Sequence, residues 1–271
     1  MILQGIAHVH SRYSYDGCHD LAEIAAFAKA RGLDFVLMSE HNRTLTDASM
    51  AAFVAECEAL TRSVGVLMVP GIECEATPDY VHVLCYGVRT LITDRQVPGI
   101  LAGVREAAGF AVLAHPIYRE ALGHVARAAL DALDGFEVWN GKADGGAYPS
   151  DIAIRRLAEM RRTGSTLVPM AGADLHRLEA YPGITLHVTC RARNAADILA
   201  ALGRRAYRVT GGSWSFAAID PLREPPRSPR RLAAAAALDV RRRAKRMSAW
   251  LTRHGLPTPA PLAHAARRIL K

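Results

Sequence analysis

Histidines and carboxylates recur along this 271-residue chain in places where they could bind metal ions. In His8-Val9-His10 the two histidines are two apart, so on a strand both imidazoles would point to one face and could reach one ion. Further acids and histidines follow later apolar segments. The candidate metal ligands are His8, His10, Asp16, His41, Glu73, His82, His115, Asp174 and His176. Divalent cations take these ligand types, and nine are too many for one tetrahedral ion, so two or three ions are expected.

Short apolar segments and helical patterns alternate along the chain and must position these residues. The strand candidates are residues 2–9, 34–39, 66–69, 81–86, 110–114, 136–139, 166–170 and 185–188. The helix candidates are residues 20–31, 47–63, 95–108, 123–133 and 151–162. Such alternation is typical of a parallel sheet or barrel, and about seven or eight units in this length favour a (β/α) barrel. Strand ends converge on one face of a barrel, and most of the candidates fall at such ends, although His82 lies near a strand's start.

The basic charge of the chain is concentrated at its C-terminal end. Residues 223–271 hold 13 Lys and Arg against 2 Asp and Glu, whereas residues 1–222 hold 21 against 24. A proline-rich joint begins at Pro221, which predicts a domain over 1–220 followed by a joint and a basic tail over 221–271. The alanine-rich part of the tail, 232–251, favours helix. The tail could be a packed helix with a solvated basic face or a non-specific nucleic-acid contact; a membrane-surface helix fits its alanine-rich face poorly.

Composition excludes several classes of protein. The five cysteines have no C-x-x-C spacing, so a disulfide framework is not expected. No apolar run approaches the roughly 18 residues of a membrane span. The N-terminal residues lack the basic and apolar regions of a secretory signal. We therefore expect a cytoplasmic protein that does not associate with membranes.

Taken together, the motifs resemble the polymerase-and-histidinol-phosphatase (PHP) superfamily over roughly residues 1–215. The matching segments are His8-Val9-His10-Ser11, Ser14-Tyr15-Asp16-Gly17, Glu40-His41-Asn42, Pro70-Gly71-Ile72-Glu73, His82, Ala114-His115-Pro116 and Gly172-Ala173-Asp174-Leu175-His176. The resemblance implies a distorted (β/α)7 barrel with up to three metal ions. One departure is Ser39-Glu40-His41, where the family often has Thr-Asp-His.

The resemblance also implies how the ligands divide among the ions. The first ion would be held by His8, His10, Glu73 and Asp174. Glu73 would bridge to a second ion bound by His82 and His115. Asp16, His41 and His176 would hold the third.

Closely spaced divalent ions, of zinc, manganese or iron, suit the hydrolysis of phosphate esters. A metal-bridging hydroxide would attack phosphorus, with Asp16, Glu73 and Asp174 as the catalytic carboxylates. Three arginines close to candidate ligands could clamp the phosphate, and two further cations are weaker candidates. The clamps are Arg43, Arg119 and Arg177; the weaker candidates are Arg12 and Lys142. Glu137 could orient a ligand histidine or pair with Lys142.

Several functions follow from this chemistry. We expect a metal-dependent hydrolase of a small phosphomonoester, such as a nucleotide or a sugar or amino-alcohol phosphate. The alternative is a nuclease on RNA or DNA that holds the polymer with residues 223–271. A protein that binds nucleic acid or another partner around a structural metal site is a third reading. A metal amidohydrolase is also conceivable from His8 and His10, although Glu73 and Asp174 fit it poorly.

Overall fold

The computed structural model describes residues 1–78, 80–212, 214–220, 222–225, 228–257 and 259. The chain divides into two compact units, Met1–Glu224 and Pro225–Lys271. The division falls within the proline-rich joint. Every candidate metal ligand belongs to the first unit.

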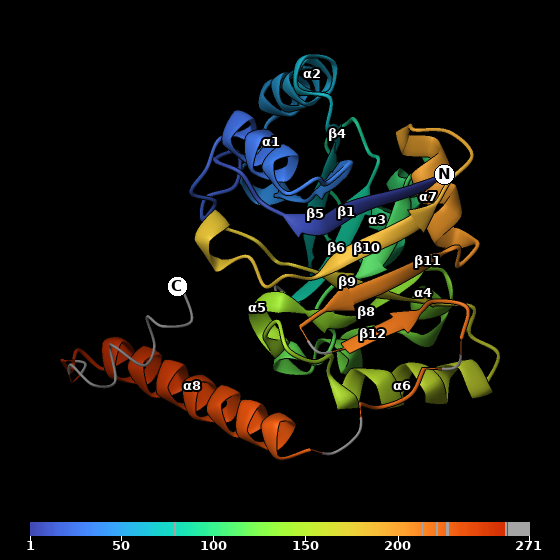
Figure 1. Cartoon of the computed structure of the whole chain (residues 1–271). Helices are drawn as coiled ribbons and strands as arrows, with labels where there is room; N and C mark the ends of the chain where they lie inside the picture. The colour runs from blue at the N-terminus through green and yellow to red at the C-terminus, as the bar shows by residue number, and fades with distance from the viewer. Residues whose placement is uncertain (79, 213, 221, 226–227, 258, 260–271) are drawn as a thin grey trace. The chain divides into compact units, whose positions relative to one another are not determined.

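Two six-stranded sheets form the framework of the first unit (Figure 1). In the order β12-β11-β10-β1-β2-β4, the strands of the first sheet are Trp214–Ala217, Tyr207–Gly211, Thr185–Thr189, Ile2–Val9, Phe35–Met38 and Leu67–Val69. In the order β3-β5-β6-β7-β8-β9, those of the second are Glu40–His41, Gly71–Ala76, Val81–Tyr86, Phe110–Leu113, Gly135–Asn140 and Val168–Gly172. The mixed α/β class is thus established, whereas one closed seven-stranded barrel is not what this pairing shows.

Both parallel and antiparallel pairs occur, which differs from the predicted repetition of strand and helix. Strand β6 is antiparallel to β5 and to β7, and β10 is antiparallel to β1. Only four residues join β5 to β6, and a parallel neighbour would need a crossover of about a dozen residues. The sequence prediction missed β5 because Gly71 and Glu73 interrupt its apolar pattern.

The two sheets meet at two places. A single residue, Ser39, separates β2 from β3, and Pro70 alone separates β4 from β5, so the chain passes directly from one sheet into the other. Beyond the end of β1, the His10 amide donates to the Leu175 carbonyl at 2.9 Å, just after β9. The ends of strands from both sheets are therefore held together where the candidate ligands lie.

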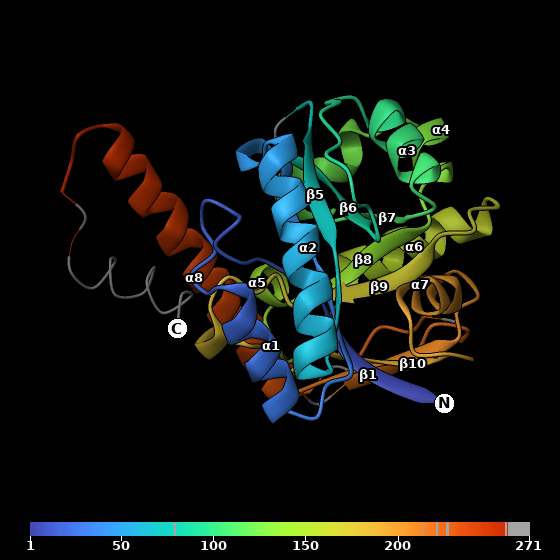
Figure 2. The ribbon, with the colours of Figure 1, turned by 90° about the horizontal axis from the view of Figure 1, so that it is seen from above.

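Helices and short 3-10 turns connect the strands. The α-helices of the first unit are α1 (Leu21–Ala30), α2 (Asp47–Val64), α3 (Val97–Glu106), α4 (Arg127–Asp131), α5 (Gly141–Asp144), α6 (Asp151–Arg162) and α7 (Ala195–Gly203). The 3-10 turns are η1 (Asn42–Thr44), η2 (Tyr118–His124) and η3 (Leu178–Ala180). Helix α1 starts at a capping box of Asp20 and Glu23, which satisfies two backbone donors of its first turn. Helices α1 and α2 pack on each other, and α3 packs on β6 and β7 (Figure 2).

The core of the first unit combines side chains of the strands with those of the covering helices. Phe35, Phe53, Phe136 and Trp139 are fully buried there, together with Ile6 of β1, Val36 of β2 and Val83 of β6. This packing fixes the strands whose ends carry the candidate ligands.

The second unit contains α8 (Pro229–Arg253), a helix of 25 residues. The Ser228 side chain caps it by accepting from the Arg231 amide, and its first residue is proline, which suits a helix start. Residues 226–227, 258 and 260–271 of the predicted basic tail lie outside the described residues. In the part of the chain that is described, no helix is both long enough and apolar enough to cross a membrane.

Candidate metal centre

Glu73, on β5, lies at the centre of the candidate ligands. Its Oε1 is 2.7 Å from His82 Nδ1, 3.1 Å from His115 Nε2 and 3.5 Å from His8 Nε2. Its Oε2 is 3.4 Å from His41 Nδ1 and 3.5 Å from His10 Nε2. Burial alone would raise the pKa of Glu73, but the neighbouring His82 and His8 hold it well below its usual value. A single buried carboxylate thus faces five imidazoles.

His82 reaches this cluster although it lies near the start of its strand. Because β6 is antiparallel to β5, the start of β6 lies beside the end of β5, and the Cα of His82 pairs with that of Glu75. The sequence prediction assumed parallel strands, in which a residue at a strand's start would point away from the active face. The reversal of β6 removes this difficulty.

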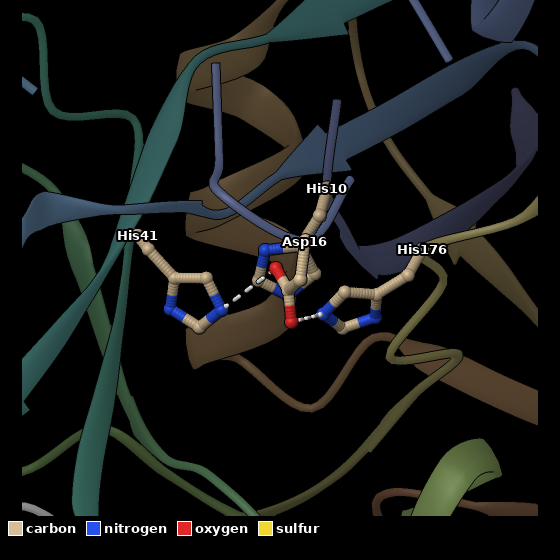
Figure 3. Close-up of side chains that lie close together, drawn as sticks. All are labelled: His10, Asp16, His41 and His176. Atoms are coloured by element: carbon tan, nitrogen blue, oxygen red, sulfur yellow. Dashed lines mark ion pairs between the residues drawn. The ribbon is translucent and has the colours of Figure 1, made fainter. Parts of the chain in front are cut away.

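Asp16, on the loop after β1, connects His41 with one further histidine, His176 (Figure 3). Its Oδ1 lies 3.3 Å from His41 Nε2, and its Oδ2 lies 2.9 Å from His176 Nε2. The His10 ring stacks against those of His41 and His176, with centroids 4.6 Å and 4.2 Å away. Burial would raise the pKa of Asp16, but the neighbouring His176 and His41 hold it below its usual value.

Asp174 completes the set of nine. Its Oδ1 lies 3.8 Å from His8 Nε2, 3.9 Å from His10 Nε2 and 3.3 Å from His176 Nδ1. Burial would raise the pKa of Asp174, but the charges of Lys142 and His8 hold it well below its usual value. All nine predicted ligands are therefore brought together.

The unpaired atoms of this cluster suit divalent cations. Five buried side-chain atoms of the described residues lack a hydrogen-bond partner, and all belong to the nine: Nε2 of His8 and of His10, Nδ1 of His41 and of His115, and Oδ1 of Asp16. Burial and the neighbouring His176 and His41 hold the pKa of His10 well below its usual value, which keeps it in the neutral form that binds metal. Three groups have ligand atoms close enough for one ion each: His10, Asp16, His41 and His176; His8, Glu73 and His115; and His8, His10 and Asp174. Buried polar atoms are rarely left unpaired, so the cluster fits metal ions.

Three of the candidate ligands have backbone conformations that residues other than glycine seldom adopt. The φ angles are +63° at His8, +28° at His115 and +51° at Asp174. At His8 the pairing of β1 with β2 also shifts register, so regular strand alternation is not what brings His8 and His10 together. Left-handed conformations of this kind are strained and gather at functional sites.

Glu137, within β8, contacts two of the ligand residues. Its Oε1 lies 3.0 Å from His8 Nδ1, and its Oε2 accepts from the His115 amide at 2.6 Å and from Asn140 Nδ2 at 2.9 Å. It therefore orients the His8 ring so that Nε2 faces Glu73. Gly172 permits this contact, because a Cβ there would lie 2.2 Å from Glu137 Oε1 and 2.6 Å from His8 Cβ.

Glu40 holds the loop that carries Asp16. Its buried carboxylate accepts from the Ser11 amide at 2.9 Å, from Ser11 Oγ at 2.7 Å and from Ser14 Oγ at 2.5 Å. Burial raises the pKa of Glu40 although the serine hydrogen bonds oppose this. Glu40 thus fixes the segment from Ser11 to Ser14, which leads to Asp16.

The predicted cations lie in different surroundings. Arg43 is exposed and pairs with the buried carboxylate of Glu75 at 3.2 Å, Arg12 donates to the Cys18 carbonyl, and Arg177 is exposed at the start of η3. The Arg119 guanidinium lies 5.3 Å from the centre of the Tyr118 ring.

Lys142, which sequence analysis ranked among the weaker candidates, is in direct contact with the cluster. Its Nζ lies 3.6 Å from Asp174 Oδ1 and 3.3 Å from His176 Nε2. Burial would lower the pKa of Lys142, but Asp174 and Asp16 raise it, so its ammonium stays charged. Lys142 lies on α5, which follows β8 directly. Its place just after a strand is the same as that of several predicted ligands, and it could have ranked Lys142 higher.

Glu75 and Ser14 also contact the cluster, although neither was predicted as a site residue. Glu75 Oε1 lies 3.9 Å from His41 Nδ1, and Ser14 Oγ contacts His10 Nδ1 at 3.3 Å and accepts from the His41 amide at 2.9 Å. Glu75 is two residues after Glu73, so the strand alternation that identified His8 and His10 could have identified it.

A separate cavity of about 560 Å³ lies beside η2, α4 and α6. Its walls are mostly apolar and include Pro116 and Ile117, which follow His115 directly. None of the nine candidate ligands lines it. The cavity is therefore distinct from the metal cluster.

No family model and no curated protein matches the chain. Solved structures do match it. A two-domain protein of Bacteroides vulgatus ATCC 8482 that contains a predicted PHP-like metal-dependent phosphoesterase has a TM-score of 0.60 and 18% identity, over 78% of this chain and 65% of that chain. The chain thus spans about two thirds of that protein.

Two further structures are similar at comparable identity. The lesion-specific endonuclease PfuEndoQ of Pyrococcus furiosus has a TM-score of 0.52 and 17% identity, over 75% of this chain and 56% of that chain. PsfC of Pseudomonas syringae PB-5123 has a TM-score of 0.50 and 14% identity, over 90% of this chain and 98% of that chain. The chain therefore shares its fold with these proteins, one of which contains a predicted PHP-like metal-dependent phosphoesterase.

Proposed function

We propose that this chain is a metal-dependent hydrolase of phosphate esters and that its cluster holds two or three divalent ions of zinc, manganese or iron. The observation that carries the proposal is the group of five unpaired buried atoms, all on predicted ligands. The ligands would divide as the motifs imply: His8, His10, Glu73 and Asp174; Glu73, His82 and His115; Asp16, His41 and His176. The PHP-like fold of the structural neighbours supports the same chemistry.

Bound divalent ions would supply Lewis acidity and lower the pKa of a water molecule to about 7, so that hydroxide is available at neutral pH. The chain's own residues hold and orient the reactants. Glu73 lies between the histidine groups, Glu137 fixes the His8 ring, and Glu40 fixes the loop of Asp16. Lys142 places an ammonium beside Asp174, where it would neutralise a phosphate oxygen.

The proposed substrate is a small phosphorylated molecule. The alternative, a nuclease, gains support from the similarity of the fold to that of PfuEndoQ, which is an endonuclease. The basic residues of 223–271 would then attract the polymer. Either substrate requires the same nine ligands and the same attack on phosphorus.

The test compares metal-reconstituted wild type with His8→Ala on phosphomonoesters, phosphodiesters and short oligonucleotides. We expect wild type to hydrolyse at least one of them, with activity lost on chelation and restored by metal. His8→Ala should lose at least about a hundredfold in turnover and part of its bound metal, since a ligand and its orientation both disappear.

His187→Gln is the matched control, because His187 lies on β10 and hydrogen-bonds to Thr210 outside the cluster. It should keep both metal and activity. Equal turnover by wild type and His8→Ala, or wild type that binds no transition metal, would refute the proposal.

A further inference from the structure

Two exposed tyrosines contact the metal cluster. The exposed fractions of Tyr15 and Tyr118 are 64% and 46%, and they are the large aromatic side chains with such exposure among the described residues of the first unit. The Tyr15 ring stacks on His41, with centroids 4.8 Å apart and an interplanar angle of 21°. The Tyr118 ring approaches His115 edge-on at 5.9 Å. Both strongly exposed rings of this unit therefore contact candidate metal ligands.

The two tyrosines lie at opposite ends of a row of imidazoles. The ring centroid of His82 lies 6.2 Å from that of His41 and 5.0 Å from that of His115. Tyr15 contacts the first end of this row and Tyr118 contacts the last. All three imidazoles face Glu73, so each phenol ring contacts an imidazole that lies beside this carboxylate.

Exposed aromatic faces at a phosphoester site indicate a substrate that carries planar rings. Exposed apolar surface beside polar groups often marks a ligand-binding site, and an aromatic ring buries a large apolar area when a ligand covers it. Nucleobases stack on such faces regardless of sequence. The cations Arg119 and Lys142, near Tyr118 and Asp174 respectively, suit the negative charge that accompanies nucleobases in a nucleotide chain. A sugar phosphate or an amino-alcohol phosphate has no aromatic ring, so it would leave both tyrosine faces in water.

We propose that Tyr15 and Tyr118 each stack one nucleobase, so that the substrate is a phosphodiester joining two unpaired nucleosides, with its phosphate at the metal cluster. This rests on the proposed function and narrows it from phosphate esters in general. The two tyrosines select the substrate and take no part in bond cleavage. Each ring should raise kcat/KM about tenfold for a substrate that carries the matching base, which is the usual effect of one base–aromatic stack.

The first experiment measures kcat/KM on the metal-loaded full chain with d(ApA) and with analogues that lack one base or both. Each missing base should lower kcat/KM about tenfold in wild type. In Tyr15→Leu or Tyr118→Leu, the ratio between d(ApA) and the doubly abasic dimer should shrink about tenfold. Tyr15→Phe and Tyr118→Phe keep the ring and should keep the ratio. Equal rates on all three dimers would overturn the inference while leaving phosphoester hydrolysis intact.

The second experiment does not depend on turnover. A dinucleotide that contains 2-aminopurine is mixed with metal-loaded protein, and its fluorescence is followed before cleavage. Stacking on tyrosine should quench the signal in wild type and in the phenylalanine variants, and less so in the leucine variants. No quenching in wild type at concentrations that saturate binding would overturn the inference, whether or not the dimer is hydrolysed. Quenching without hydrolysis would uphold the ring sites and count against the proposed function.

Discussion

Glu73 shows how much of the chemistry is concentrated in single residues. Its two oxygens lie within 3.5 Å of nitrogens from five histidines that are distant in sequence. The candidate ligands could be predicted from the sequence because each of them follows or begins a short apolar segment. The left-handed backbone at His8, His115 and Asp174 was not readable, since it depends on how neighbouring strands cross.

The contact of Glu137 with His8 gives a prediction at this scale. Glu137→Gln keeps the shape but has one oxygen in place of two acceptors, so either His8 Nδ1 or the pair formed by the His115 amide and Asn140 loses its partner. We expect metal affinity to fall about 10- to 100-fold, measured by competition with a chelating dye. Excess metal should restore most of the turnover.

Glu159→Gln is the control for this change, because Glu159 pairs with Arg156 on α6 away from the cluster. It should leave metal affinity unaltered. Unchanged affinity in Glu137→Gln would show that the His8 ring is oriented by other contacts.

Strands and loops decide which side chains actually meet. Several elements were predictable: the predicted segments 2–9, 81–86 and 151–162 coincide with β1, β6 and α6. The direction of β6 could not be predicted, because the spacing of apolar residues does not show which strands pair. The contact of Lys142 with Asp174 depends on the short helix α5, which is not among the predicted helices.

The end of β9 gives a prediction for this level. In Gly172→Ala, the new methyl group would overlap the Glu137 carboxylate and the His8 Cβ, so β9 must shift away from β8. We expect a loss of about 1–3 kcal/mol in the free energy of unfolding, measured by urea denaturation, with reduced metal content.

Gly123→Ala is the matched control, because a Cβ there meets no atom within 4 Å. It should be neutral in both measurements. If Gly172→Ala keeps full stability and metal, the tight approach of β9 to His8 is absent in solution.

On the scale of the whole molecule, the predicted metal ligands and the basic tail lie in different parts of the chain. The nine ligands all belong to Met1–Glu224, whereas 13 basic residues lie in 223–271. The sequence indicated this separation through composition. It could not indicate how the first unit divides into two sheets, because that division depends on contacts between distant segments.

Removing residues 225–271 tests the role of the second unit. Hydrolysis of a mononucleotide-sized substrate should persist, since the ligands and their core remain. Affinity for a single-stranded oligonucleotide should fall, and its dependence on salt should weaken by about 0.7 logarithmic units per lost phosphate contact. Binding titrations at several salt concentrations measure this slope. An identical slope in both proteins would exclude the tail from nucleic-acid contact.

The single-residue connections from β2 to β3 and from β4 to β5 bring the two sheets together at the metal cluster, so bound metal would affect the stability of the contact between them. His8 and His10 come from the first sheet, and Glu73, His82 and His115 come from the second or the turn that follows it. Ions shared between these groups would act as cross-links between the two sheets. Metal binding would then add to the stability of the folded chain, and chelation should make the contact between the two sheets more sensitive to proteolysis.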